Sequence, residues 1–144
     1  MTSVSVSVDM AAPVEWVWAR LRDFNGLPGW LEFVRSSRLS HDGQLRHLET
    51  IDGKTIVEEL LELSEPHTFY RYSIVEGPDP VTDYTATLSA QQSAVGDTTV
   101  TWSSRFDPLD TQKAELLAGH YEVVYRAGLN RLKRLVEEEA SARG

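Results

Sequence analysis

The stretch that decides the fold is the last one, DTQKAELLAGHYEVVYRAGLNRLKRLVEEEASA, which runs from Asp110 to Ala142. The spacing of its apolar residues predicts one long amphipathic helix. At about 100° per residue these residues cover an arc of roughly 220°, interrupted by Arg131, whereas a helix on a flat sheet needs only about 100°. The wide arc predicts a helix that is gripped on several sides. It consists of Leu116, Ala127, His120, Val124, Leu117, Leu135, Gly128, Tyr121, Leu132, Tyr125, Val136 and Leu129.

The chain before this helix begins with one strand and two short helices. Valine alternates with serine over residues 4–8, which is typical of a strand with one buried face. Pro13 suits the first turn of a helix, and the residues after it form an apolar stripe. We expect Asp23 to cap a second short helix that stops within residues 26–29, where glycine and proline gather.

From Val34 to Phe106 the pattern is that of β-strands. Asp42-Gly43 and Asp52-Gly53 predict two-residue hairpin turns, because these residue types tolerate the positive φ of a type I′ turn. Gly96-Asp97 is a third turn signal of this kind. Together they predict an antiparallel meander of about six strands. With the first strand, this gives an α+β fold in which a curved antiparallel sheet of about seven strands surrounds the C-terminal helix.

Composition limits the class of protein and its partners. The chain has 144 residues, enough for one domain with a sizeable core, and 41% of them are hydrophobic. Its net charge of −8 argues against nucleic acid and anionic membrane surfaces as partners. The absence of cysteine excludes disulfides and thiolate metal sites. No apolar run is long enough to span a membrane, and the N-terminus does not read as a secretory signal, so we expect a cytoplasmic protein.

Three groups of residues, taken together, resemble a known superfamily. They are Val17-Trp18 through Asp23-Phe24 to Trp30; Glu58 to Leu63 with Glu76-Gly77-Pro78 and Tyr84; and Ala127-Gly128-Leu129. By these residues the chain resembles the START-like, helix-grip superfamily, specifically the bacterial polyketide cyclase/dehydrase-like (SRPBCC) proteins. The resemblance covers nearly the whole chain and implies a single START-like ligand-binding domain over residues 1–144.

The resemblance also implies a cavity between the sheet and the last helix, where the superfamily holds lipids, polyketides, sterols and hormones. Plant abscisic-acid receptors look like more distant relatives, but they carry an inward lysine where this chain has Leu31 and a longer gate loop where it has Asp52-Gly53. Hormone sensing is therefore not expected. The residues that the resemblance places at the cavity wall are Leu31, Phe33, Glu58, Tyr72, Ile74, Val81, Tyr84, Trp102, His120, Val124 and Gly128.

Two adjacent carboxylates on one predicted strand are candidates for chemistry. Glu58 and Glu59 point to opposite faces of that strand, so only one can enter the cavity. Counting apolar neighbours would bury Glu59, whereas the resemblance places Glu58 inside, and a β-bulge could reset the register. Close bacterial relatives have arginine after the Glu58 equivalent, where this chain has Glu59. An inward carboxylate would have a raised pKa and could act as a general acid or base, or it could be a wall residue bonded to water or arginine.

His120 is the second candidate, because it lies on the helix arc one turn before Val124. It could donate a proton or orient a ligand carbonyl, or it could be a hydrogen-bonded core histidine. No second histidine follows it at the spacing of a metal site. The loop at residues 76–80 contains two prolines and could be a gate at the cavity mouth or only a rigid turn.

The leading hypothesis is a protein that binds a small hydrophobic molecule, possibly aromatic or polyketide-like, without cofactor or metal, as a monomer or homodimer. The alternative is a polyketide cyclase or dehydrase type of enzyme in which Glu58 and His120 are the catalytic residues and move protons. A second alternative is an interaction or stress-response module that uses the fold without a ligand. The sequence does not decide between carrier and enzyme.

Overall fold

The computed structural model describes residues 1–143 and confirms the predicted α+β, helix-grip architecture. One antiparallel sheet has the strand order β1-β7-β6-β5-β4-β3-β2, so every neighbour except β1–β7 is consecutive in the chain. The elements are β1 (Thr2–Met10), α1 (Val14–Leu21), the 3₁₀ turn η1 (Leu27–Gly29), β2 (Val34–Ser40), β3 (Leu45–Thr50), β4 (Thr55–Ser64), β5 (Phe69–Glu76), β6 (Val81–Ala94), β7 (Asp97–Pro108), the 3₁₀ turn η2 (Thr111–Lys113) and α2 (Ala114–Arg143).

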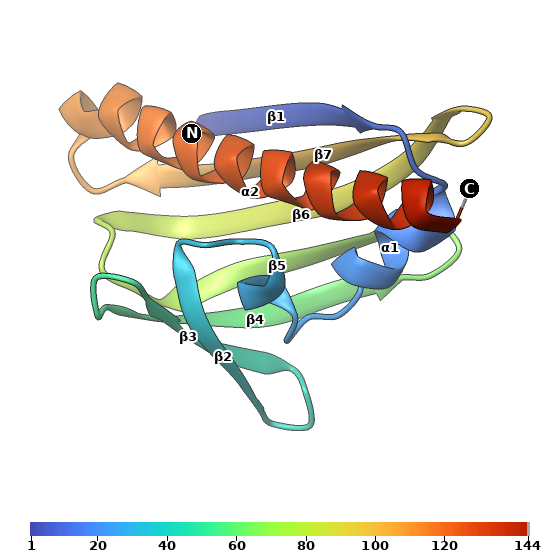
Figure 1. Cartoon of the computed structure of the whole chain (residues 1–144). Helices are drawn as coiled ribbons and strands as arrows, with labels where there is room; N and C mark the ends of the chain where they lie inside the picture. Colours follow the sequence, from blue (N-terminus) through green and yellow to red (C-terminus); the bar gives the residue numbers. More distant parts are fainter. Residues whose placement is uncertain (144) are drawn as a thin grey trace.

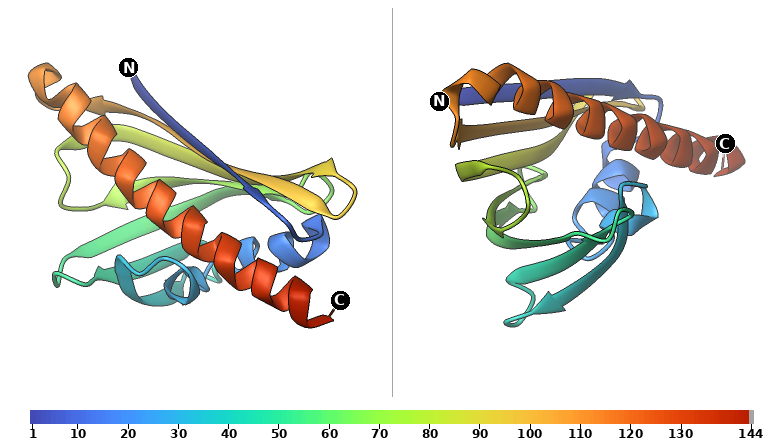
Figure 2. Two further views of the ribbon diagram at one scale, coloured as in Figure 1. Left: turned by 45° about the horizontal axis from the view of Figure 1, so that its top comes forward. Right: turned by 90° about the vertical axis from the view of Figure 1, so that its left-hand side faces the viewer.

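The sheet bends around the helices. Figure 1 shows α2 crossing the sheet on the side of β1 and β7, with α1 and η1 on the same side. In the right-hand view of Figure 2 the sheet curves from β1 beneath α2 round to the hairpin of β2 and β3. The core therefore lies between the concave face of the sheet and the three helical elements. No helix within residues 1–143 has the length and apolar character that crossing a membrane requires.

Alternation decides which side chains reach this core. In β1 the valines at positions 4 and 6 are buried while the serines between them are exposed. In β7 every second residue from Thr98 to Phe106 is buried, and β6 repeats the pattern from Tyr84 to Ala90. The α1 stripe of Val17, Trp18 and Leu21 is buried as the helical period predicts.

A bulge in β4 explains why simple counting along this strand misleads. Opposite β5 the register shifts between Leu60 and Glu62, so Leu61 is an extra residue without a partner in the ladder. Leu60 and Leu63 consequently both pack against the core, although their spacing is odd. Glu58 is 6% exposed and lies inside, whereas Glu59 is only half-buried. Counting every second residue along the strand would bury Glu59. That count is wrong because the bulge at Leu61 changes which residues face the core, so the apolar residues before and after Leu61 do not lie on one face.

The expected turns and the second helix are each in part wrong. Ser40 pairs with Leu45, and Thr50 pairs with Lys54 through their backbones, so these loops have four and three residues instead of two. A glycine with positive φ marks where a hairpin turns, but loop length follows the register that buries the inward side chains. The second helix is only the 3₁₀ turn Leu27–Gly29, and Asp23 caps a separate turn by accepting the N–H of Asn25 at 3.2 Å.

The buried stripe of α2 is narrower than the arc predicted from its sequence. Leu116 is 71% exposed, and His120 and Ala127 are also exposed. The helix is held by β1 and β7 on one side and by the residues around η1 at Gly128, and its remaining flank faces solvent. The grip is therefore two-sided. The residues buried on α2 are Leu117, Tyr121, Tyr125, Gly128, Leu129, Leu132 and Val136.

Candidate functional site

A hollow of about 50 Å³ lies between α2 and the concave face of the sheet, and we call it the inner hollow. Nine of the eleven residues expected at the cavity wall line it; Val81 lines a neighbouring hollow and Gly128 lines neither. The expected cavity wall did not include the other seven lining residues, which are Leu27, Val34, Leu48, Ile56, Asp79, Tyr121 and Tyr125. The full lining is Leu27, Leu31, Phe33, Val34, Leu48, Ile56, Glu58, Tyr72, Ile74, Asp79, Tyr84, Trp102, His120, Tyr121, Val124 and Tyr125.

The inner hollow is too small for a ring as it stands. A cavity of about 10–15 Å³ holds one water molecule, and an engineered apolar cavity of about 150 Å³ takes up benzene. At about 50 Å³ the inner hollow has room for a few waters. A guest of drug size therefore requires the surrounding side chains to move.

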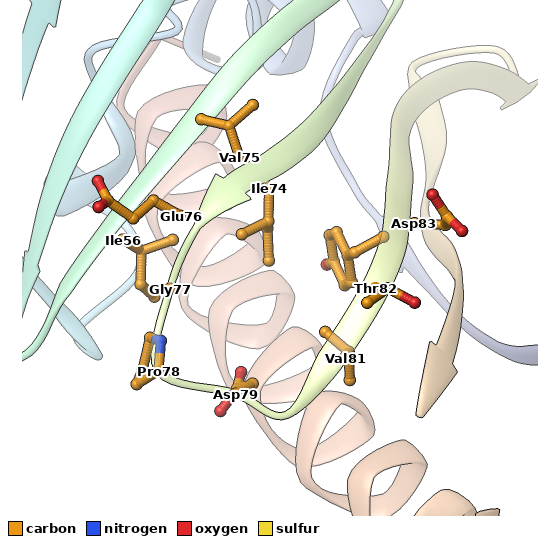
Figure 3. Close-up of a pocket in the computed structure, with 11 residues that line it drawn as sticks. Ile56, Ile74, Val75, Glu76, Gly77, Pro78, Asp79, Val81, Thr82 and Asp83 are labelled. Atoms are coloured by element: carbon orange, nitrogen blue, oxygen red, sulfur yellow. The ribbon is translucent and has the colours of Figure 1, made fainter. Parts of the chain in front are cut away.

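A second hollow of about 270 Å³ adjoins the first beneath the loop between β5 and β6, and we call it the loop hollow. Figure 3 shows Ile56, Ile74 and Val81 around the space that this loop encloses. Four residues line both hollows and form the partition between them: Ile56, Ile74, Asp79 and Tyr84. Joined together, the two hollows would reach the lower end of the size range of ligand pockets, about 300 Å³.

The β5–β6 loop is fastened to the rest of the molecule at two points. The Tyr121 hydroxyl on α2 donates to the Asp79 carboxylate at 2.9 Å, and the N–H of Leu109 donates to the carbonyl of Pro80 at 2.9 Å. Burial and the nearby Asp79 carboxylate raise the pKa of Tyr121, so this hydroxyl stays protonated. The Tyr121–Asp79 bond is the side-chain link that holds the partition against the helix.

The charge beside the inner hollow belongs to a buried ion pair. Arg46 is fully buried and its Nε donates to Glu58 Oε1 at 2.7 Å. The same guanidinium donates to the carbonyl of Phe24 at 2.9 Å, and it lies 4.1 Å above the ring of Phe24. Its Nη2 has no hydrogen-bond partner within residues 1–143. Burial raises the pKa of Glu58, and Arg46 opposes that rise without cancelling it.

Glu58 reaches the inner hollow with one oxygen. Oε1 accepts the Arg46 bond, while the Glu58 side chain keeps 8% of its exposure and lines the hollow. Oε2 accepts no hydrogen bond from residues 1–143 and is not fully covered, so it is the oxygen that is free to accept a hydrogen bond from a group in the hollow. Arg46 was missed by the sequence reading, although it lies directly opposite Glu58 in the β3–β4 ladder and shares a face with the buried Leu48. Counting back from the expected two-residue loop at Asp52-Gly53 would have paired Arg46 with Glu59, and only the observed three-residue loop pairs it with Glu58.

A chain of hydrogen bonds, which we call the tyrosine chain, crosses the wall opposite Glu58. Trp102 Nε1 donates to the Tyr72 hydroxyl at 3.1 Å, and that hydroxyl lies 3.3 Å from the Tyr84 hydroxyl. Tyr84 bonds in turn to Tyr125, whose hydroxyl donates to Ser104 Oγ at 2.9 Å. Burial raises the pKa of all three tyrosines, so they remain neutral hydroxyls.

On α2, His120 lines the inner hollow as the resemblance implies, whereas Gly128 lines neither hollow. His120 is exposed at the rim of the inner hollow, where its ring meets Phe33 edge to face with centroids 6.3 Å apart. It is therefore not a core histidine. Gly128 fits tightly against the side chains of Leu31 and Trp30, which explains why a glycine stands there. Among residues 1–143 no cluster of His, Asp or Glu side chains has the arrangement of a metal site.

The chain is similar in sequence and in structure to known proteins. Residues 1–137 match a family model described as polyketide cyclase/dehydrase and lipid transport. The protein XoxI from Bacillus cereus is 32% identical, with 94% of this chain and 96% of that chain covered and a TM-score of 0.90. An uncharacterized protein from Bacillus thuringiensis is 33% identical, with 93% and 98% covered and a TM-score of 0.83.

A more distant structure shares the fold. The Zhui aromatase/cyclase from a Streptomyces species has a TM-score of 0.86 over 99% of this chain and 97% of its own, at 20% identity. At that identity the likeness concerns the architecture alone. The long C-terminal helix across a curved seven-stranded sheet is thus common to proteins whose sequences differ widely.

Proposed function

The chain belongs to the polyketide cyclase/dehydrase and lipid transport family, and from that premise we propose that it binds a small, mainly aromatic molecule between the sheet and α2. One observation carries the proposal. The inner hollow, which has a carboxylate at one wall and aromatic rings around it, is separated from the larger loop hollow only by the partition of four side chains. Apolar walls with a few placed polar groups are typical of ligand sites.

Binding requires the partition to give way. Ile56 and Ile74 can change rotamer, and the loop can move outward once the Tyr121–Asp79 hydrogen bond breaks. Such a bond contributes about 0.5–1.5 kcal/mol net, which a buried aromatic ligand can offset by removing its own apolar surface from water. The inner hollow is thus small because the proposed site is in a closed form, and the ligand would occupy an open form of the same site.

A second function, proton-transfer catalysis, is favoured by the position of Glu58. A carboxyl with a raised pKa and one oxygen facing a hollow is suited to general acid or base chemistry. His120 at the rim could serve the other end of a substrate. In an enzyme of this kind, Glu58→Gln and His120→Ala lower turnover much more than they lower substrate affinity. In a carrier the same substitutions lower ligand affinity alone.

The test is a ¹H–¹⁵N NMR titration of the whole chain with three probes of similar size: 4-ethylphenol, 4-ethylanisole and 4-methylacetophenone. We expect saturable shifts for at least one probe at the amides of Ile56, Tyr84 and Val124, which surround the inner hollow. Amides on the outer face, such as those of Ser5 and Thr87, serve as internal controls. If no probe gives saturable shifts around the hollow, the chain is not a carrier of small aromatic ligands, and an interaction module without a ligand becomes the better description.

A further inference from the structure

The hydrogen-bond donors of the tyrosine chain are all engaged. Tyr125 donates its single proton to Ser104, so in the bond between Tyr125 and Tyr84 the donor is Tyr84. The Tyr84 proton is then used, so the bond between Tyr84 and Tyr72 takes its proton from Tyr72. Tyr72 itself accepts from Trp102. All hydrogen bonds of the tyrosine chain therefore point the same way, from the Trp102 N–H toward Ser104. The Trp102 N–H and the three tyrosine hydroxyls have no proton left to donate to a ligand.

The rest of the lining offers acceptors instead. The Tyr121 proton goes to Asp79, which leaves the second oxygen of that carboxylate with only lone pairs. Glu58 presents Oε2, a carboxylate oxygen, to the inner hollow. In the inner hollow the exception is His120, which lies at the rim and is exposed to water, and the loop hollow adds the exposed hydroxyl of Thr82. Arg46 does not line either hollow, because its guanidinium is covered by Phe24.

The charge of the site disfavours a cationic donor. Arg46 already compensates Glu58 at 2.7 Å, so an ammonium group that donates to Glu58 would lose its hydration without meeting an unpaired carboxylate, and the other carboxylate of the inner hollow, Asp79, which has no ion pair within residues 1–143, lies at the partition. A neutral hydroxyl has a much smaller desolvation cost and can still donate to the carboxylate. A ketone, an ester or an ether carries acceptors only, and its oxygen would face the lone pairs of Glu58 and of the tyrosine hydroxyls.

We propose that the site selects a neutral aryl compound with a free hydroxyl group, a phenol, which donates to Glu58 Oε2, and that it rejects carbonyl-rich chains of similar size. The inference rests on the proposed function, because it names the ligand class of the same site. The aromatic body would lie among Trp102, Tyr84 and Phe33, whose rings line the inner hollow. Rejection of carbonyl groups distinguishes this reading from a site that folds a poly-carbonyl substrate.

The experiment measures dissociation constants of the unaltered chain for 4-ethylphenol, 4-ethylanisole and 4-methylacetophenone by NMR titration, with 4-methylbenzylamine as the cationic donor. We expect 4-ethylphenol to bind about tenfold or more tightly than the ether and the ketone, the difference that one hydrogen bond to a charged acceptor makes. Equal or tighter binding of the ketone or ether overturns the inference while leaving the binding function intact. Tightest binding of the amine overturns the preference for a neutral donor. Failure of every probe to bind overturns the function itself.

Two variants test whether Glu58 accepts the hydrogen bond from the phenol hydroxyl. Glu59→Gln is the matched control, because Glu59 is the neighbouring carboxylate and lines neither hollow, and it should keep the full preference for the phenol. The double variant Arg46→Met with Glu58→Met removes both charges together, so no charge is left buried and unpaired. In that double variant we expect the preference for 4-ethylphenol over 4-ethylanisole to fall below about threefold. An unchanged preference there would show that Glu58 is not the acceptor.

Discussion

At the scale of single residues, Gly128 sets how much room the inner hollow has. A Cβ at this position would lie 2.6 Å from Leu31 Cδ1 and 3.2 Å from Trp30 Cζ3. Leu31 lines the inner hollow, so its flexible end can turn into that space. Gly128→Ala should therefore change the free energy of unfolding by less than about 1 kcal/mol, since the gain in helix propensity offsets the displacement. It should also weaken 4-ethylphenol binding, because Leu31 then fills the hollow.

The control for this change is Gly119→Ala on the same helix. Nothing lies within 4 Å of the Cβ that it would add, so the change should stabilise the chain by up to about 1 kcal/mol and leave binding as it was. Urea unfolding and NMR titration measure the two quantities. Unimpaired binding in Gly128→Ala would mean that Leu31 moves elsewhere or that the ligand does not use the inner hollow.

The buried ion pair of Arg46 and Glu58 leads to a prediction about how stability changes with pH. Arg46→Met leaves the Glu58 carboxyl buried without a cation, which should cost about 3–5 kcal/mol of unfolding free energy at neutral pH. The folded-state pKa of Glu58 then lies further above its ordinary value of 4.5. For a raised pKa, stability is present below the unfolded value and is lost as the pH rises through the folded value.

Urea denaturation between pH 4 and pH 8 shows whether stability falls as the pH rises. The stability deficit of Arg46→Met relative to the unaltered chain should be largest at pH 8 and smallest near pH 4, where Glu58 is protonated. The double variant with Glu58→Met removes the titrating group, so its own stability should lack the loss with rising pH that Arg46→Met shows. A deficit in Arg46→Met that grows toward low pH would contradict the assignment of the raised pKa to Glu58.

The site shows which residue-scale features can be predicted from sequence. Tyr84 and Trp102 line the inner hollow as expected, because their strands alternate without interruption over the relevant stretch. Glu58 could be placed inside only through the family resemblance, since the bulge at Leu61 breaks the alternation on its strand. Arg46 was missed because a charged residue is seldom expected in a core, and its burial depends on a partner twelve positions later.

At the scale of elements, a carboxylate on α2 holds the segment that leads from β1 to α1. Glu137 on α2 accepts the backbone N–H of Ala11 at 2.8 Å and pairs with Lys133 at 2.5 Å. The Ala11 hydrogen bond and the Lys133 charge lower the pKa of Glu137. For a lowered pKa, stability is present above the unfolded value of about 4.5 and is lost as the pH falls through the folded value.

Glu137→Gln should therefore cost about 1 kcal/mol at pH 7 and less at pH 3, because the stabilisation by the carboxylate is lost as the pH falls through the lowered pKa. Chemical denaturation at the two pH values measures the difference. Glu138→Gln is the matched control, because Glu138 is exposed at the next position, and it should stay within about 0.5 kcal/mol at both. A pH-independent cost in Glu137→Gln would show that packing of the side chain, and not its charge, holds the helix here.

The order of elements could be predicted because each boundary has a local cause. Alternating valines, Pro13 and the positive-φ glycines act within a few residues of themselves. The width of the buried stripe on α2 could not be predicted, because an exposed apolar residue such as Leu116 looks the same in sequence as a buried one. Which flank of the helix is covered depends on β1 and η1, which are distant in the chain.

At the scale of the whole molecule, access to the site depends on how β5, β6 and α2 move relative to one another. The four residues that line both hollows come from β4, β5, β6 and the β5–β6 loop, and the Tyr121–Asp79 hydrogen bond links that loop to α2. Opening must break this bond before a ring can pass. The rate of ligand association, more than the affinity, should therefore respond to its loss.

Tyr121→Phe removes the hydroxyl and keeps the ring, so the loop loses its side-chain link to α2 while the core stays filled. We expect the association rate of 4-ethylphenol, followed by tryptophan fluorescence in a stopped-flow instrument, to rise about threefold to tenfold, the effect of one net hydrogen bond. Hydrogen exchange at the Val81 and Leu109 amides, which donate to the carbonyls of Asp79 and Pro80 in the loop, should quicken by a similar factor. Tyr70→Phe is the control, since Tyr70 lines neither hollow and accepts only a long 3.4 Å bond from Arg46. An equal acceleration in Tyr70→Phe would assign the effect to general loosening of the core, and an unchanged rate in Tyr121→Phe would place the route to the site elsewhere.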